Sequence, residues 1–291
     1  MSASQQLSTS MHVLERGPAG AAIHAYSEQG QLDEHPLKTW QTSHTLFSPD
    51  GRFLASIKAD EVTICDTGNN MILHSISSPG TIALHFSSTS KYLSVYQKAN
   101  ATGAGDKKNL CVYEVKEGLK LYACFQKSFT KADWPYIQFS ADDSIACRAV
   151  TNEVHFLRCS DFGAQALRLR VPRLVTAKLS PGHPATLATF VPEINGQPGS
   201  VCVYTPPPND SDTAIELPPL ARKSFFRIQE VDFNWAHDGS AVLILGSSDV
   251  DATNQSYYGE TSLHFMRAEG DLDCKVSEKM HRAPRSSLNA L

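Results

Sequence analysis

Short apolar stretches separated by turn-forming residues recur along most of the chain. The clearest example starts at Phe47, which ends one apolar stretch and is followed by Ser48-Pro49-Asp50-Gly51. Proline fixes φ at the second position of a turn and glycine accepts the left-handed conformation, so this tetrapeptide predicts a tight turn. Apolar stretches at 52–57 and 62–66 follow, with a short polar step between them. The pattern predicts three consecutive strands of an antiparallel meander.

The same pattern returns four times further along the chain. An aromatic residue or leucine followed by a polar turn occurs at Phe86, Phe139, Leu179 and Trp235, which lie 39, 53, 40 and 56 residues after the preceding copy. Two of these intervals are close to the roughly 40–45 residues of a WD-type propeller blade. We interpret the extra residues of the two longer intervals as loops. The sequence therefore predicts an all-β fold, a β-propeller of four-stranded WD-type blades with about five blades present.

The limits of this pattern predict the organisation of the chain. Apolar stretches at 11–14 and 21–26 indicate that residues 1–39 form an N-terminal segment with a partial blade. We expect the propeller blades in residues 40–270. The alternation stops after that, and residues 271–291 contain several basic residues but almost no β-branched ones. We therefore expect an unstructured tail that differs from the blades.

Composition limits the partners and the compartment of the protein. The 291 residues carry a formal net charge of −4, so no global positive field would hold the chain on nucleic acid, and any such contact must be a local patch. The seven cysteines include no Cys-x-x-Cys pair, and five fall in apolar stretches, as reduced core thiols do. This favours a cytosolic or nuclear compartment. No stretch fits a signal peptide or a membrane span, so we expect no membrane partner.

The sequence contains no pattern typical of an active site. It has no Gly-x-Ser-x-Gly elbow, so a peptidase with a propeller domain would lack its nucleophile. Residues 103–108 (Gly-Ala-Gly-Asp-Lys-Lys) superficially resemble a phosphate-binding loop, but the P-loop spacing is absent and we favour a flexible loop. Asp249 and Asp251 could ligate a cation, but no further carboxylates follow at EF-hand spacing. We predict no enzymatic activity, no cofactor and no metal site.

Basic and aromatic residues in loops and on blade edges are the candidates for a binding surface. If the basic residues share one rim, they could pair with rRNA or tRNA phosphates. The alternative is a solvated face of mixed charge. Two tyrosines of a long insert could stack on a base or a partner, or cap the top of the blade. The candidate contacts for RNA or the ribosome are Arg168, Arg170, Arg173, Lys178, Arg222, Lys223, Arg227, Tyr257 and Tyr258.

Three further stretches carry a family resemblance. They are 152–156 (Asn-Glu-Val-His-Phe), 223–226 (Lys-Ser-Phe-Phe) and 248–260, which runs from Ser-Asp-Val-Asp to Ser-Tyr-Tyr-Gly-Glu. Leu-His-Phe follows at 263–265. Together, and at this spacing, they resemble the family of eukaryotic translation initiation factor 2A, the single-chain WD-repeat factor. The resemblance covers roughly residues 40–266, and the Ser-Tyr-Tyr-Gly-Glu loop is its most specific part.

The resemblance implies a propeller, usually of nine blades, followed by a basic and helical region. It implies a cytoplasmic, non-catalytic factor that acts at the small ribosomal subunit and assists the binding or delivery of initiator tRNA without GTP. It also suggests mRNA and other initiation factors as further candidate partners.

The sequence resembles a C-terminally truncated form of this family. Five blades of a nine-blade ring would leave two blade faces bare, so we expect an incomplete, open ring. The alternative function is that of a generic WD-repeat scaffold, which binds proteins through its loops and has no role at the ribosome.

Overall fold

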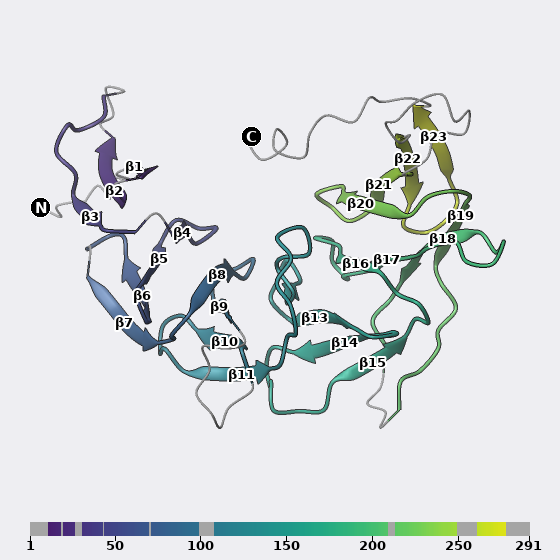
Figure 1. Cartoon of the computed structure of the whole chain (residues 1–291), viewed down its shortest axis with the longest axis horizontal. Helices are drawn as coiled ribbons and strands as arrows, with labels where there is room; N and C mark the ends of the chain where they lie inside the picture. Colours follow the sequence, from purple (N-terminus) through teal and green to yellow (C-terminus); the bar gives the residue numbers. More distant parts are fainter. Residues whose placement is uncertain are drawn as a thin grey trace, which may run out of the picture. The chain divides into compact units, whose positions relative to one another are not determined.

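The computed structural model describes residues 11–18, 20–26, 31–42, 44–69, 71–98, 108–208, 213–248 and 261–277. All regular structure in these residues is β-strand (Figure 1). In the part of the chain that is described, no helix is long and apolar enough to cross a membrane. The chain divides into two compact units, Met1–Phe129 and Thr130–Leu291, and each is considered by itself.

The first unit contains three antiparallel sheets. The N-terminal sheet has three strands in the order β1-β2-β3, and the next two sheets, blade 1 and blade 2, have four strands each. The strands of the N-terminal sheet are β1 (Met11–Gly17), β2 (Gly20–Tyr26) and β3 (Lys38–Trp40). Blade 1 consists of β4 (Thr45–Phe47), β5 (Phe53–Lys58), β6 (Glu61–Asp66) and β7 (Ile72–Ser77). Blade 2 consists of β8 (Thr81–Phe86), β9 (Tyr92–Gln97), β10 (Leu110–Glu114) and β11 (Lys120–Cys124).

The second unit contains three four-stranded antiparallel sheets, blades 3, 4 and 5. Blade 3 consists of β12 (Gln138–Phe139), β13 (Ile145–Val150), β14 (Glu153–Arg158) and β15 (Leu167–Arg170). Blade 4 consists of β16 (Thr176–Leu179), β17 (Leu187–Val191), β18 (Gly199–Tyr204) and β19 (Ala221–Phe225). Blade 5 consists of β20 (Glu230–Trp235), β21 (Ala241–Ser247), β22 (Thr261–Arg267) and β23 (Asp273–Ser277).

The predicted propeller of five four-stranded blades is confirmed. In every sheet, strands that are neighbours in sequence pair with one another, as in a meander. Propeller rings usually close through a sheet that combines strands from the two ends of the chain. Among the described residues no sheet does so, because each sheet belongs to one unit. The prediction of an unclosed propeller is confirmed in this respect.

Two details of the predicted organisation are wrong. Residues 271–291 were expected to be unstructured, but β23 lies inside that segment and completes blade 5. As the outer strand of its blade it is exposed at the positions that are described, so it lacks the apolar alternation that marks the other strands. The partial blade also extends to Trp40, because β3 pairs with β2 of the N-terminal sheet.

The apolar core of each unit lies between the faces of successive sheets. Strand β9, for example, is buried at all six positions, which means that blade 2 is covered on both faces. One buried cluster joins blades 1 and 2 in the first unit. In the second unit one cluster joins blades 3 and 4, and another joins blades 4 and 5. Inner strands such as β9 therefore read as apolar runs, because water reaches neither face.

The cysteines support the expectation of reduced core thiols. Cys65, Cys111, Cys147, Cys159 and Cys202 are buried and form no disulfide. Burial disfavours the charged thiolate, and it raises the pKa of Cys147 to about 12. The Cys147 thiol is therefore a packing residue rather than a nucleophile.

A buried serine follows the first strand in four of the five blades. Ser48, Ser87, Ser140 and Ser180 are at most 3 % exposed. Each Oγ accepts a hydrogen bond from a backbone N–H at the beginning of the second strand, with distances of 2.9, 3.0, 3.1 and 2.8 Å. Blade 5 has Ala236 at this position. The serine thus satisfies a donor at the turn, and this explains why serine recurs in the repeat.

Replacing Ser87 with alanine is expected to lower the free energy of unfolding by about 1–3 kcal/mol, because the Tyr92 N–H loses its acceptor. The adjacent Ser88 is exposed, so Ser88→Ala is a matched control that should change stability by less than about 0.5 kcal/mol. Urea unfolding of both variants measures the difference. Equal stabilities would show that the Ser87 hydroxyl does not stabilise this turn.

Candidate nucleic-acid interface

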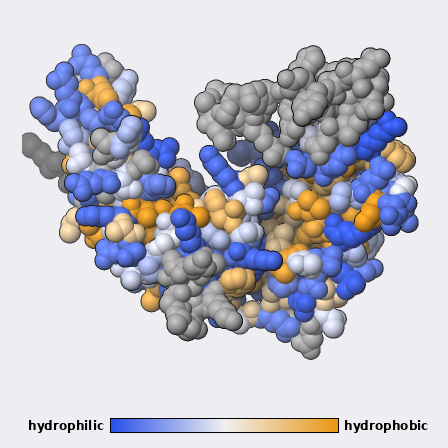
Figure 2. Space-filling model, in the orientation of Figure 1, coloured by the Kyte–Doolittle hydropathy of each residue, from blue (hydrophilic) through white to orange (hydrophobic). Residues whose placement is uncertain are grey.

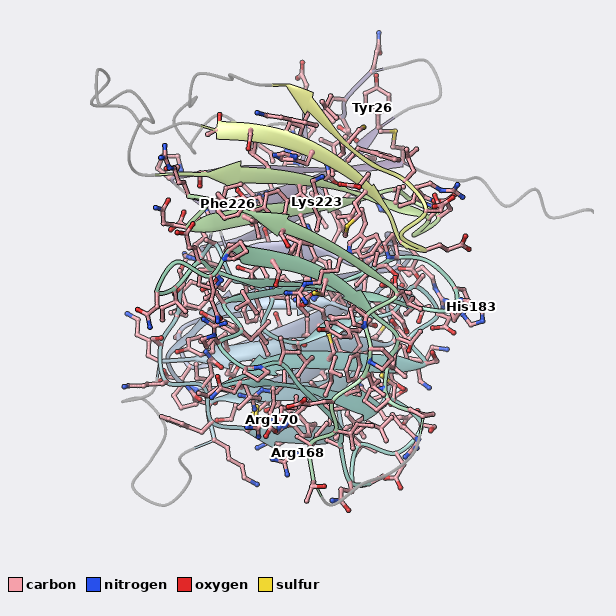
Figure 3. All side chains as sticks on the ribbon, turned by 90° about the vertical axis from the view of Figure 1, so that its right-hand side faces the viewer. Tyr26, Arg168, Arg170, His183, Lys223 and Phe226 are labelled. Atoms are coloured by element: carbon pink, nitrogen blue, oxygen red, sulfur yellow. The ribbon has the colours of Figure 1, made fainter. Side chains whose placement is uncertain are left out.

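The turns of the second unit lie at two opposite ends of its strands. Because successive strands are antiparallel, the turn between the second and third strands and the connection to the next blade lie at the same end. We call this end the loop face; it comprises 151–152, 171–175, 192–198 and 226–229, together with Ser248 and Thr261. Phe226 on the loop face and His183 on the opposite turns lie at opposite sides in Figure 3.

The turns opposite the loop face are closely packed. A Cβ on Gly182 of blade 4 would come within 2.5 Å of the Asp238 carbonyl oxygen of blade 5. The His183 ring lies 3.3 Å from Asp142 of blade 3. Neighbouring blades are therefore fixed to one another at this end, and the loop face is the end at which side chains are freer to reach a ligand.

Arg173 and Arg227 occupy equivalent positions on the loop face. They lie in the connections that enter blade 4 and blade 5, and both have left-handed backbones, with φ of +65° and +61°. The Arg173 N–H donates to Asn152 Oδ1 at 2.7 Å, and the Arg227 N–H donates to Glu193 Oε2 at 2.8 Å. Both acceptors belong to the preceding blade. In each arginine the backbone N–H is thus fixed by a hydrogen bond, whereas the residue itself is exposed.

The left-handed conformation costs a residue with a Cβ about 1–2 kcal/mol. The connection that enters blade 2 of the first unit avoids this cost, because Gly80 has φ of +67° there. Arginine at the two equivalent positions therefore needs another explanation, and strained backbone positions cluster at functional sites.

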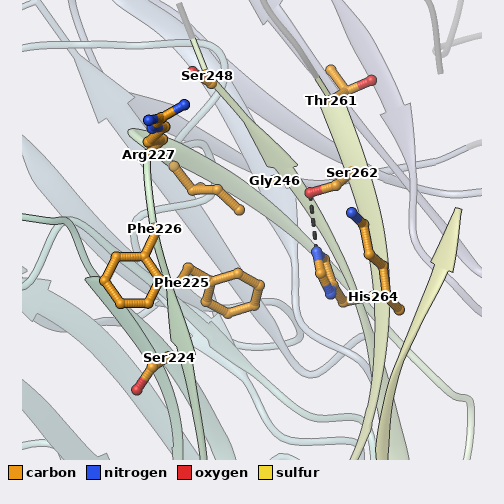
Figure 4. A pocket seen from close by; sticks show the side chains of 11 residues that line it. Ser224, Phe225, Phe226, Arg227, Gly246, Ser248, Thr261, Ser262 and His264 are labelled. Carbon is orange, nitrogen blue, oxygen red and sulfur yellow. Dashed lines mark hydrogen bonds between the residues drawn. The ribbon is translucent and has the colours of Figure 1, made fainter. Parts of the chain in front are cut away.

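A pocket of about 250 Å³ lies beside Arg227. One wall is formed by the end of β19 and the connection after it, and the other by β21 and β22 (Figure 4). Ile228 lies against the backbone of Gly246. A Cβ added to Gly246 would come within 2.4 Å of Ile228 Cδ1. The pocket is thus shaped by a glycine near the end of β21.

Aromatic and hydroxyl groups make up much of the pocket wall. Some apolar residues remain on the surface of the protein (Figure 2), and Phe226 has the largest exposed fraction of the described large apolar residues, 70 %. Phe225 is buried, and its ring makes an edge-to-face contact with His264 at 4.9 Å between centroids. The hydroxyl groups that line the pocket belong to Ser224, Ser248, Thr261 and Ser262.

The charges at the pocket are positive. Arg227 and Lys275 line it, and no acidic side chain does so within the described residues. Lys223 is next to the lining residues and forms an ion pair with Asp273. Burial holds the pKa of His264 below its usual value, and the charges of Lys223 and Lys275 lower it further, against an opposite effect of Asp273. The imidazole is therefore neutral at pH 7, and Arg227 and Lys275 are the cations of the wall.

The structure does not bring together the seven candidate contact residues that it describes. Arg168 and Arg170 lie on β15 of blade 3, well separated from Lys223 on β19 (Figure 3). Of these seven residues, only Arg227 lines the pocket. Tyr257 and Tyr258 lie outside the residues that the structure describes.

Several of the candidates contact groups of the protein itself. Arg168 donates from Nε and Nη2 to Glu153 Oε2 at 2.9 and 2.8 Å, and Arg170 lies 3.3 Å from Glu216. Lys178 donates to the Phe233 carbonyl oxygen at 2.8 Å, which links the first strands of blades 4 and 5. Lys223 pairs with Asp273, as described above.

Three candidates remain available to a partner. Within the described residues, no acidic side chain forms an ion pair with Arg173, Arg222 or Arg227, and all three residues are exposed. Whether any of the nine contacts RNA stays a prediction.

Sequence reasoning did not assign Phe226, His264 and Lys275 to a site. Phe226 and His264 were noted only as parts of motifs that resemble a family, and Lys275 as one of the basic residues of the tail. A pocket between two blades is built from strands about 40 residues apart, so no local pattern identifies it.

The pocket coincides with the part of the chain that a family model matches. The model described as Eukaryotic translation initiation factor eIF2A matches residues 223–283, a range that includes all the lining residues. Eukaryotic translation initiation factor 2A of Schizosaccharomyces pombe is 34 % identical over 232 residues, which are 79 % of this chain. The chain belongs to this family.

Two further relatives agree with this assignment. Eukaryotic translation initiation factor 2A of Dictyostelium discoideum is 29 % identical over 254 residues, which are 84 % of this chain. A crystal structure of a eukaryotic initiation factor is 27 % identical, with a TM-score of 0.70 over 90 % of this chain and 62 % of the other. The chain covers 38 % and 40 % of the length of the two curated factor 2A relatives.

Acidic pH is expected to destabilise the second unit through His264 and His155. Burial is the main cause of the lowered pKa of both imidazoles. The unfolded chain therefore takes up protons near pH 6.5 that the folded chain does not, so stability is complete above that pH and falls as the pH decreases below it.

Thermal unfolding at pH 7.5, 6.5 and 5.5 tests this expectation. His264→Gln cannot titrate, so its melting temperature should fall less between pH 7.5 and 5.5 than that of the unchanged protein, although His155 still contributes. The exposed His237 provides the control variant His237→Gln, which should retain the full pH dependence. The same pH dependence in His264→Gln as in the unchanged protein would contradict the assignment.

Proposed function

We propose that this chain is part of a translation initiation factor that acts at the small ribosomal subunit and assists the binding of initiator tRNA without GTP. One observation carries the proposal: the family match at 223–283 coincides with the basic, aromatic pocket of blades 4 and 5. The relatives are named as initiation factors, but this chain spans only about two fifths of their length, so their activity is assigned to it as a proposal.

The loop face of the second unit is the part of the chain that suits this role. Arg173 and Arg227 present cationic side chains from fixed backbones, and Arg222 lies on the outer strand of blade 4. Binding to RNA phosphates needs cations that are not neutralised by the protein itself. Arg168, Arg170 and Lys223 are less suitable, because each forms an ion pair with an acidic residue.

Co-sedimentation with small ribosomal subunits over a series of salt concentrations tests the proposal. We expect binding that weakens steeply with salt, because phosphate contacts release counterions. The triple variant Arg173→Glu, Arg222→Glu, Arg227→Glu should bind at least about tenfold more weakly and with a smaller salt slope. Lys116→Glu, Lys120→Glu, Lys127→Glu makes the same change of charge at exposed residues of the first unit and is the matched control.

A folded chain that stays in the supernatant at low salt would contradict a ribosome site in this chain. Equal loss of binding in the two triple variants would show that net charge matters and that the position of Arg173, Arg222 and Arg227 does not. A circular dichroism spectrum and a melting temperature close to those of the unchanged protein confirm that each variant is folded.

The tRNA step has a separate test. If the chain contributes to a factor that works without GTP, the amount of initiator tRNA retained on small subunits should rise on addition of the chain, and by the same amount with and without GTP. Retention that requires GTP would contradict the proposed mechanism, even if the chain binds the subunit.

The alternative function, a scaffold for protein partners, is favoured by an apolar region in the first unit. Met71, Ile72 and Leu73 at the start of β7 are exposed, and so are Leu119 and Leu121 beside β11. The two groups are neighbours, because a Cβ on Gly118 would come within 2.7 Å of the His74 ring. Exposed apolar regions of this kind often bind proteins. Salt-insensitive association with a protein partner, without subunit binding, would support this alternative.

A further inference from the structure

The pocket beside Arg227 combines features that fit one kind of ligand. Its cations, Arg227 and Lys275, attract an anion. The carboxylates nearby, Glu193 and Asp273, are not among the described lining residues; Glu193 accepts from the Arg227 backbone and Asp273 pairs with Lys223. It also includes an exposed aromatic residue, because Phe226 lines it with 70 % of its surface exposed. A ligand that satisfies both features carries a negative charge next to a flat ring.

The size of the pocket limits this ligand to a small group, such as one residue of a polymer. A volume of about 250 Å³ is below the range of most sites for larger small molecules. It can take a single base with part of its sugar and phosphate. The hydroxyl groups of the wall, for example those of Ser224 and Ser262, can donate to or accept from the edge of a base.

The groups around the pocket are held in place before any ligand binds. The Glu193 carboxylate fixes the backbone of Arg227, and the ring of Phe225 packs edge-on against His264. His264 Nε2 lies 3.0 Å from Ser262 Oγ, within hydrogen-bond distance (Figure 4). A site with fixed walls loses little entropy when it binds, which favours recognition of a small unit.

We propose that this pocket binds one nucleotide of single-stranded RNA, with the base stacked on Phe226 and the phosphate paired with Arg227 and Lys275. The inference rests on the proposed function, because it names the part of an RNA partner that this surface would recognise. Single-stranded RNA is commonly recognised by stacking of unpaired bases on aromatic side chains, with cations along the backbone. A phosphorylated peptide would use the cations but would have no need for the exposed ring.

Binding of labelled tetranucleotides of adenylate and of uridylate, followed by fluorescence anisotropy, tests the proposal. Phe226→Ala should weaken binding about 5- to 150-fold, because stacking on one aromatic ring is worth roughly 1–3 kcal/mol. Phe226→Trp keeps a stacking surface and should restore binding. Its indole fluorescence should also be quenched when a base stacks on it. Arg227→Gln should weaken binding and reduce the salt slope by about 0.7, the value for one phosphate contact on a single strand.

Matched controls separate the pocket from its surroundings. Arg173 has the same left-handed backbone as Arg227 but does not line the pocket, so Arg173→Gln should change tetranucleotide binding less than about twofold. Phe125 is an exposed phenylalanine of the first unit, and Phe125→Ala should bind as the unchanged protein does. Phe226 and Arg227 are exposed, so their replacement should leave the melting temperature nearly unchanged.

Several outcomes would overturn the proposal. Unchanged binding in Phe226→Ala would exclude stacking on this ring. Competition by inorganic phosphate as effective as that by adenosine or uridine monophosphate would indicate a site for anions alone. Binding of a phosphoserine peptide in preference to the tetranucleotides would indicate a protein partner.

The experiment also separates this inference from the proposed function. Tetranucleotide binding that depends on Phe226, together with no binding to small ribosomal subunits, would support the pocket and contradict the ribosomal role. Subunit binding that is unchanged in Phe226→Ala, with no tetranucleotide binding, would support the ribosomal role and contradict the nucleotide pocket.

Discussion

Apolar packing between the faces of successive sheets is the interaction on which the rest of each unit depends. A single four-stranded sheet cannot bury both of its faces, and the central strands here are apolar on both, as β9 shows most clearly. Side chains add specific links between first strands: Gln138 of β12 bonds to the backbone of β16, and Trp235 of β20 donates to the Lys178 carbonyl oxygen. Because the sheets hold one another by their faces, exposed loop residues such as Arg173 and Phe226 are not needed for the core and are available for binding.

The loop face of the second unit shows how this freedom is used. The two arginines that enter blades 4 and 5 take the same left-handed conformation, and each is held by a side chain of the preceding blade. A pocket lies beside the second of them, where Gly246 leaves room for Ile228 and the Phe225 ring packs against His264. The surroundings of two positions that are equivalent in the repeat thus depend on side chains of the neighbouring blade.

The architecture could be predicted from the sequence, but most of the candidate site could not. Turn chemistry at Ser48-Pro49-Asp50-Gly51 and its later copies predicted the blades, because each turn recurs at the end of an apolar strand and local chemistry defines it. Strand β23 was missed, since an exposed outer strand needs no apolar alternation. The ion pairs of the two arginines of β15 could not be predicted, because Glu153 lies on an adjacent strand and Glu216 on a distant connection, which spacing along the chain does not reveal. The pocket depends on side chains from two blades, and only the fold shows that they meet.

The contact of Arg170 with Glu216 belongs to a larger feature. The connection between β18 and β19 of blade 4 runs beside the outer strand of blade 3, where Ile215 pairs with Leu169 in parallel and exchanges backbone hydrogen bonds of 2.8 and 2.9 Å with Arg170 and Arg168. The outer strand of a sheet otherwise offers unpaired backbone groups to any extended chain, including another copy of itself. Ile215 covers part of β15 in this way, so blade 3 is protected from edge-to-edge aggregation by a segment of its neighbour. Local unfolding of blade 4 would therefore also expose unpaired backbone groups of β15. Unfolding of one blade would thus make the neighbouring blade prone to aggregate as well.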